Sequence, residues 1–183
     1  MTPLAAQAIG TGRLDLLPLR VEHAEEMAVV LSDPALHTFT GGAPDTVESL
    51  RSRYRRITAG SGDPAVAWLN WVVRLRAESC LTGYVQATVR GPVAEIAWVV
   101  GTPWQGRGIA TEAACGLVAW LTTRLPAVTV IARIHPDHHA SAAVARAAGL
   151  VPTDVRHDGE TRWHRPAVPS AGAAGAGRGG SGG

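Results

Sequence analysis

The chain has 183 residues, enough for one domain with a sizeable core and too few for two ordinary domains. Hydrophobic residues make up 46% and charged residues 17% of the sequence, a balance that indicates a globular protein and excludes a disordered one. All 17 basic residues are arginines and the formal net charge is only +2, so nothing argues for nucleic acid as a partner.

The sequence shows no targeting or membrane segment. The N-terminus lacks the basic region, apolar run and cleavage site of a signal peptide, and no apolar stretch approaches the ~20 residues that cross a bilayer. Cys80 and Cys115 lie in apolar segments without a C-x-x-C pair, which suits buried thiols in a reducing compartment. We therefore expect a cytoplasmic protein without a membrane partner.

The N-terminal third of the chain predicts one strand followed by two helices. After a flexible leader at residues 1–12, the apolar positions of residues 13–20 fit a short strand. Helical spacing of apolar residues follows over residues 22–31. A Gly-rich loop and an N-cap at Asp45 then introduce a second helix, over residues 45–59.

The rest of the chain predicts four strands, a weak two-stranded hairpin and two further helices. Strands are predicted at 66–75, 81–90, 94–100 and 128–134, helices at 109–124 and 139–148, and a weak hairpin at 151–155 and 161–164. This order indicates one mixed α/β domain over residues 13–165. The remaining residues, 166–183, are Ala, Gly, Pro and Ser with one Val and one Arg and predict a disordered tail.

The segment that joins the strand at 94–100 to the helix at 109–124 has the features of an anion-binding site. A strand, a glycine-containing loop and a helix in this order leave unpaired backbone N–H groups at the positive end of the helix dipole. Gly106 and Gly108 allow a ligand to approach the backbone closely, and Arg107 adds a positive charge. The sequence therefore predicts a phosphate or pyrophosphate site.

Two common nucleotide loops fit this segment poorly. A mononucleotide P-loop requires Lys and then Ser or Thr where Arg107 and Gly108 stand. A dinucleotide loop requires a third glycine where Thr111 stands, and it follows the first strand of a βαβ unit. The pattern that does fit is [QR]-x-x-G-x-[GA], met by Gln105-Gly106-Arg107-Gly108-Ile109-Ala110.

This pattern resembles the pyrophosphate loop of the GNAT superfamily of N-acetyltransferases. Residues 11–20 resemble the opening strand of its RimJ/RimL-like branch, which acetylates the N-termini of ribosomal proteins, and residues 95–100 resemble its fourth strand. Residues 136–146 are similar to a block that usually reads N-x-x-S, with His138 in place of the asparagine and Ser141 as the serine. The resemblance implies one GNAT-like α/β domain. Its mixed, mostly antiparallel sheet would have six to seven strands, with about four flanking helices and splayed fourth and fifth strands.

The resemblance also implies that acetyl-CoA is the co-substrate and lies in the gap between the splayed strands. Backbone groups of Trp98, Val99 and Val100 would pair with the pantetheine arm, and the backbone N–H groups of residues 105–111 would hold the pyrophosphate. Neutral histidine can both donate and accept a hydrogen bond, so His138 is predicted to replace the asparagine as a cofactor contact.

In the family an amine attacks the thioester directly, so the enzyme supplies a base, a partner for the oxyanion and a proton donor for the thiolate. Glu95 is the predicted base, with an exposed strand-end charge as the alternative. Ser141 is the predicted proton donor, with a role at a helix N-cap as the alternative. His138 could instead titrate near neutral pH and act as the acid or base. Glu112, in the first turn of a helix, is predicted to be structural.

The sequence leaves the acceptor open between a small-molecule amine and a peptide N-terminus. One of Trp68 and Trp71, which a strand places on opposite faces, is predicted to be core. The other, with His37 or Phe39 in the Gly-rich loop, could line the acceptor pocket or simply pack in the core.

A non-enzyme interpretation is a catalytically inactive, acyl-CoA-binding regulatory module. No metal is predicted, because no Cys or acidic ligand set accompanies His135, His138 and His139 at a known spacing. Relatives are often dimers, so the resemblance is also compatible with a homodimer.

Overall fold

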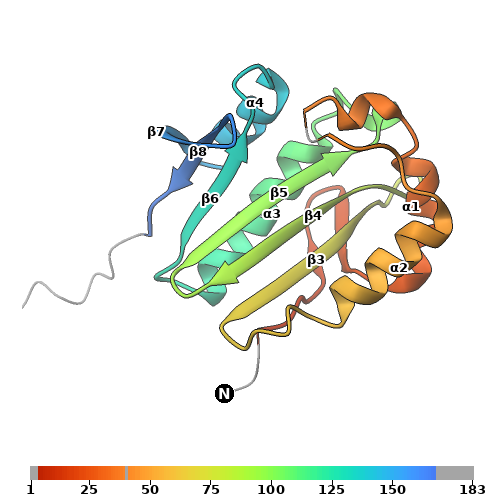
Figure 1. Ribbon diagram of the computed structural model, residues 1–183, viewed down its shortest axis with the longest axis horizontal. Helices are drawn as coiled ribbons and strands as arrows, with labels where there is room; N and C mark the ends of the chain where they lie inside the picture. Colours follow the sequence, from red (N-terminus) through yellow and green to blue (C-terminus); the bar gives the residue numbers. More distant parts are fainter. Residues whose placement is uncertain (1–3, 40, 168–183) are drawn as a thin grey trace, which may run out of the picture.

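The computed structural model describes residues 4–39 and 41–167 (Figure 1). Its centre is an eight-stranded sheet in the order β1-β2-β3-β4-β5-β6-β8-β7. The strands are β1 (Ile9–Gly10), β2 (Leu14–Pro18), β3 (Val66–Leu75), β4 (Cys80–Arg90), β5 (Val93–Val100), β6 (Thr129–Ile134), β7 (Val151–His157) and β8 (Glu160–Arg165). Neighbours are antiparallel except β5 and β6, which are parallel. The mixed, mostly antiparallel sheet is confirmed, with slightly more strands than predicted.

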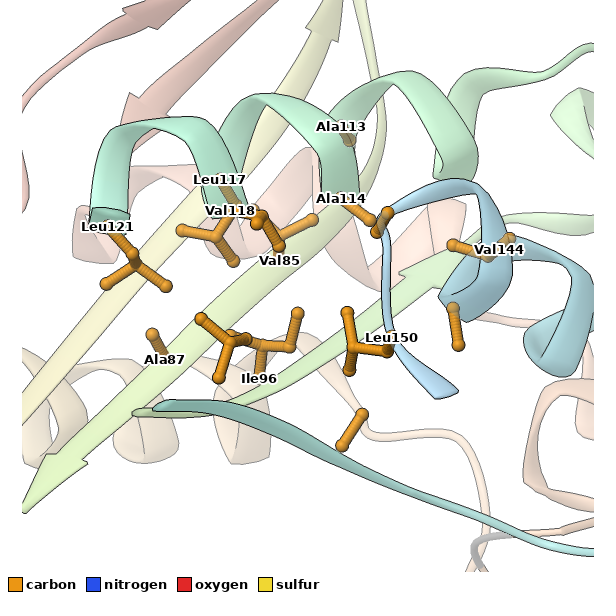
Figure 2. Packing of buried hydrophobic residues seen from close by; sticks show 14 of the residues in the cluster. Val85, Ala87, Ile96, Ala113, Ala114, Leu117, Val118, Leu121, Val144 and Leu150 are labelled. Carbon is orange, nitrogen blue, oxygen red and sulfur yellow. The ribbon is translucent and has the colours of Figure 1, made fainter. Parts of the chain in front are cut away.

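Helices cover both faces of this sheet (Figure 1). They are α1 (Ala24–Val30), α2 (Val47–Thr58), α3 (Ile109–Arg124) and α4 (His139–Ala147), with single 3₁₀ turns η1 (Val21–His23), η2 (Pro34–His37) and η3 (Thr102–Trp104). One buried cluster, which includes Ile96, Leu117 and Leu150, lies between the sheet, α3 and α4 (Figure 2). A second, which includes Met27 and Leu50, lies under α1 and α2. Within the described ranges, no helix is long and apolar enough to cross a membrane.

The N-terminus of α2 differs from the prediction by one residue. The N-cap is Thr46, whose Oγ1 accepts the backbone N–H of Ser49 at 3.1 Å. The prediction of Asp45 as the cap is therefore wrong. Its carboxylate instead accepts the Ser49 hydroxyl at 2.7 Å and pairs with Arg53 at 2.7 Å. Both residues are good caps by type, so only the backbone position of the first helical turn decides between them.

Part of the predicted leader belongs to the sheet. Ile9 and Gly10 form β1 against β2, and the Trp71 indole N–H donates to the Gln7 carbonyl at 2.7 Å. A two-residue strand is too short to show a period of two, which is why the sequence pattern misses it. Residues 1–3 of the leader, and residues 168–183 of the predicted tail, lie outside the described residues.

The parallel pair β5 and β6 separates along its length. Residues 93–95 pair with residues 129–131, and the register goes no further. Beyond that point β5 continues beside β4 up to Val100, while β6 continues beside β8 up to Ile134. The two strands therefore splay toward their carboxyl ends, as the family resemblance implies, and the second half of β5 keeps one edge open.

Candidate active site

A cavity of about 740 Å³ lies where β5 and β6 separate. Its wall comes from β4, the open half of β5, the loop that follows, the first turn of α3, the end of β6 and the start of α4. The predicted site residues that line it are Trp98, Val99, Val100, Gln105, Gly106, Gly108, Ile109, Ala110, Thr111, His138 and Ser141. Two predicted site residues, Glu95 and Arg107, are not among the described residues that line the cavity.

The open edge of β5 presents alternate backbone groups to the cavity. The N–H of Gly101, directly after β5, donates to a carbonyl of β4 at 2.8 Å. Because alternate residues of a strand bond to opposite neighbours, the groups of Val99 are directed to β4, and those of Trp98 and Val100 to the open side. The amide of Gln105 accordingly donates to the Val100 carbonyl at 3.0 Å. Val99 thus contributes its side chain to the wall.

The loop between β5 and α3 presents unpaired N–H groups to the same cavity. Gly106 and Gly108 have φ of 73° and 75°, in the left-handed region that favours glycine. The first helical bond of α3 runs from the Glu112 N–H to the Gly108 carbonyl. In the described chain, no backbone bond uses the N–H groups of residues 109–111, which stand at the positive end of the helix dipole. This geometry suits an anion such as a pyrophosphate.

Arg13 and Glu112 fasten this loop to β2. The Arg13 guanidinium donates to the Arg107 carbonyl at 2.9 Å and to the Glu112 carboxylate at 2.7 Å. Glu112 also accepts the Thr11 hydroxyl and the Arg13 backbone N–H, both at 2.6 Å. Burial alone would raise the pKa of the Glu112 carboxyl, but these hydrogen bonds outweigh it and lower the pKa. The contacts support the structural role predicted for Glu112.

The Arg107 side chain is directed to the turn between β3 and β4. Its guanidinium donates to the Glu78 carboxylate at 2.5 Å, and the Trp104 indole N–H donates to the same carboxylate at 3.2 Å. The hydrogen bond from Arg107, followed by that from Trp104, lowers the pKa of Glu78. The side chain of Arg107 is therefore tied to protein in this structure, and its exposed position leaves it free to exchange partners.

His138 and Ser141 form a hydrogen-bonded pair at the start of α4. His138 is the N-cap of α4, where its Nδ1 accepts the Ser141 backbone N–H at 3.4 Å, and its Nε2 lies 3.1 Å from the Ser141 Oγ. Phe39 stacks on the His138 ring, with centroids 4.4 Å apart. Phe39 also contacts His135, with centroids 5.2 Å apart. Burial, followed by the charges of His135 and His139, lowers the pKa of His138. The ring is therefore neutral near pH 7.

Glu95 lies at the closed end of the splayed pair, where β5 still pairs with β6. Its carboxylate is 3.3 Å from the Arg133 guanidinium, and both side chains are more than one third exposed. Arg133 does line the cavity. The predicted base is thus beside the cavity rather than in its described wall.

Sequence reasoning missed four polar residues of the cavity wall: Tyr84, Gln86, Arg133 and Glu160. Burial raises the pKa of Tyr84, so its hydroxyl stays protonated. Tyr84 also borders an adjoining hollow of about 50 Å³, which is lined in part by His37, Asp45 and Arg53. The alternation of β4 could have placed Tyr84 and Gln86 on one face, but no local signal ties that face to the loop after β5.

The ring side chains considered for the acceptor pocket lie in different parts of the structure. Trp71 is fully buried, whereas Trp68 is 39% exposed, so the prediction that one of the two is core is confirmed. Phe39 lines the main cavity and His37 the adjoining hollow. Trp68 is absent from the described wall of both.

A splayed parallel pair, an open strand edge and a glycine loop at a helix start together define an acetyl-CoA-binding transferase fold. A family model described as "Acetyltransferase (GNAT) domain" matches residues 13–151. The chain therefore belongs to the GNAT acetyltransferase family, and it is an acetyl-CoA-dependent acetyltransferase. No curated protein sequence matches the chain.

Solved structures support the same fold. A GNAT-family acetyltransferase from Bacillus anthracis aligns with TM-score 0.74 and 19% identity over 87% of this chain and 98% of that one. RimL, a ribosomal L7/L12 α-N-protein acetyltransferase in complex with CoA, gives TM-score 0.73 and 16% identity over 87% and 98%. The ribosomal-protein-S5-alanine acetyltransferase from Vibrio fischeri gives 0.70 and 15% over 88% and 97%. The resemblance to the RimJ/RimL-like branch is thus confirmed at the level of the fold.

Proposed function

We propose that the protein moves the acetyl group of acetyl-CoA to a primary amine by direct attack in the cavity between β5 and β6. The observation that carries the proposal is the continuity of two kinds of unpaired backbone group. The outward groups of Trp98 and the outward N–H of Val100, whose carbonyl accepts the Gln105 amide, meet the N–H groups at the start of α3 along one wall. An extended amide chain that ends in a pyrophosphate fits this arrangement.

Acetyl-CoA then occupies this wall in a defined direction. Its pantetheine amides pair with the outward groups of β5, beside the Val99 side chain. Its pyrophosphate lies on residues 105–111, with Arg107 supplying a positive charge if it leaves Glu78. His138 and Ser141 line the cavity at the start of α4, after β6, and face the thioester end of acetyl-CoA.

The reaction forms a C–N bond, breaks the C–S bond and moves one proton from nitrogen and one to sulfur. The amine nitrogen attacks the thioester carbonyl carbon, the C–S bond breaks, one proton leaves nitrogen, and the sulfur takes up one proton. Ser141, which lines the cavity, supports the departing sulfur with its hydroxyl. Glu95 is the proposed base and acts through water, since it does not line the cavity itself but pairs with Arg133, which does. Glu160 lines the cavity directly and is the second candidate for the base.

The acceptor is a primary amine, either a small molecule or a peptide N-terminus. RimL acts on a ribosomal protein, and the microcin C7 self-immunity acetyltransferase MccE was solved with acetyl-CoA and AMP. Tyr84, Gln86 and Glu160 supply polar groups to the acceptor side of the cavity. The proposal places this reaction in the cytoplasm, supported by free thiols at Cys80 and Cys115. A homodimer remains a prediction.

The test is release of free CoA thiol from acetyl-CoA in the presence of a panel of amines. The panel contains peptides with free N-terminal Ala or Ser, polyamines and aminoglycosides, with N-acetylated peptides as matched controls. Amine-dependent release that the acetylated controls do not support is the expected result. Binding of acetyl-CoA with no amine-dependent release would instead identify the inactive regulatory module.

A further inference from the structure

We propose that His138 is a positioning residue, which holds the Ser141 hydroxyl with its hydrogen directed away from the ring and into the cavity. This role rests on the acetyl transfer proposed above. It concerns a histidine that stands where the family usually has asparagine. The contacts of the two ring nitrogens carry the proposal, because each nitrogen meets a different group of Ser141.

The backbone contact selects the tautomer of the ring. The Ser141 backbone N–H can only donate, and it points to Nδ1 of His138 at 3.4 Å. A neutral imidazole has one N–H and one acceptor nitrogen, so an accepting Nδ1 places the ring hydrogen on Nε2. Nε2 lies 3.1 Å from the Ser141 Oγ and therefore donates to it. The serine hydroxyl, occupied as an acceptor on the ring side, keeps its own hydrogen for a partner in the cavity.

Two neighbouring features keep the ring in this state. Phe39 stacks on it at an interplanar angle of 23°, which fixes the ring plane. The N-terminus of α4 disfavours a cation, since the helix dipole is positive there. Protonation would also add a hydrogen to Nδ1 and abolish the cap. Burial and the neighbouring histidines His135 and His139 act in the same direction and lower the pKa.

The pair is consequently polarised in the sense opposite to a Ser–His nucleophile. In a nucleophile pair the histidine nitrogen accepts the serine hydrogen. Here Nε2 donates, so it does not activate the Ser141 oxygen for attack on the thioester. The hydroxyl instead donates a hydrogen bond to the sulfur as the C–S bond breaks and negative charge develops there. The amine proton leaves through the base, and solvent supplies the proton that the thiolate finally takes up.

The substitution His138→Asn separates positioning from capping. Asparagine is a strong N-cap, so α4 keeps its first turn, but its amide N–H group is held on a shorter side chain and does not take the place of Nε2. We expect kcat to fall roughly tenfold, the effect of one hydrogen bond in the transition state, while KM for acetyl-CoA changes less than about twofold. In a Ser141→Ala background the same substitution should change kcat no further.

Three results would overturn the proposal. These are an unchanged kcat in His138→Asn, an equal loss of kcat with and without Ser141, or a rise in KM alone. The last result would make His138 only a cofactor contact. Nitrogen-15 NMR of the histidine ring gives a readout that needs no activity, with the Nε2–H tautomer expected and the Nδ1–H tautomer contradicting the inference. If wild type transfers no acetyl group to any amine, the proposed function fails while the NMR result still tests the geometry.

Discussion

Replacement of Glu112 tests whether this side chain in the first turn of α3 stabilises the fold or takes part in catalysis. Its carboxylate accepts hydrogen bonds from the Thr11 hydroxyl, the Arg13 backbone N–H and the Arg13 guanidinium, at 2.6, 2.6 and 2.7 Å. These contacts join the N-terminal segment to the first turn of α3. They also hold Arg13, which in turn holds the Arg107 carbonyl in the glycine loop.

The expected loss of stability follows from these contacts. The bonds from Thr11 and the Arg13 backbone contribute about 1–1.5 kcal/mol each, at the low end for charged acceptors because solvent reaches the site. The Arg13 ion pair adds less than ~1 kcal/mol, since half of that side chain is exposed. Glu112→Ala should therefore lower the free energy of unfolding by about 2–3 kcal/mol. For a domain of this size that lowers Tm by roughly 4–12 °C.

Glu112→Gln is the matched variant, because it keeps the size of the side chain and one acceptor but removes the charge. We expect about half the loss of stability at neutral pH. The pKa of Glu112 is lowered in the folded state, so the folded chain binds fewer protons than the unfolded chain in acid. The advantage of wild type over Glu112→Gln should stay constant above the ordinary pKa of 4.5 and shrink as the pH falls below it.

Urea unfolding followed by circular dichroism measures these differences, and thiol release measures kcat on the same samples. The structural assignment predicts lower stability with kcat within about threefold of wild type when the folded fraction is taken into account. A large loss of kcat in Glu112→Gln with unchanged stability would refute it and make Glu112 a catalytic group.

Three further predictions concern other parts of the site. Gly83→Ala should prevent folding, since a Cβ there would overlap the β5 backbone. The control Gly10→Ala should fold normally, because nothing lies near its Cβ, and soluble yield and Tm compare the two variants. Arg107→Ala should weaken acetyl-CoA binding less than tenfold, by an amount that shrinks with added salt in calorimetry, because its guanidinium is exposed. Because the pKa of His138 is lowered on folding, the unfolded chain binds more protons than the folded chain below about pH 6.5, and the free energy of unfolding should fall with acid there. Unfolding curves measured at a series of pH values should lose this contribution to the pH dependence in His138→Asn.

The local features of the fold could be predicted from the sequence. The bounds of α3 match those expected, because Gly108 precedes the helix and Pro126 follows shortly after it. The end of α4 is likewise set by Gly149, which has φ of 83°. The glycine loop is local too, since six consecutive residues supply both its conformation and its N–H groups. A short stretch of sequence therefore contained most of the predicted cofactor wall.

The rest of the cavity is assembled from segments that are distant in sequence. Phe39 reaches His138 from the loop before α2, and Glu160 enters from the start of β8. Neither contact leaves a local pattern. The tautomer of His138 also depends on the contacts of its two ring nitrogens with Ser141, which the predicted start of the helix does not specify. The choice of base stays open for a similar reason, because Glu95 could be placed on its strand but not relative to Arg133 on the next.

The central claim is that acetyl-CoA binds with its pyrophosphate on the loop at residues 105–111. Calorimetric titration of acetyl-CoA into wild type, Gly106→Glu and Gly62→Glu tests it most directly. The two glycines have φ of 73° and 76°, and a Cβ at either meets nothing within 4 Å, so the backbone strain is matched. Only Gly106 lines the cavity. We predict micromolar binding by wild type and Gly62→Glu, and a loss of at least about 100-fold in Gly106→Glu, where a carboxylate repels the pyrophosphate. Equal binding by all three proteins, or no binding by folded wild type, would contradict the account.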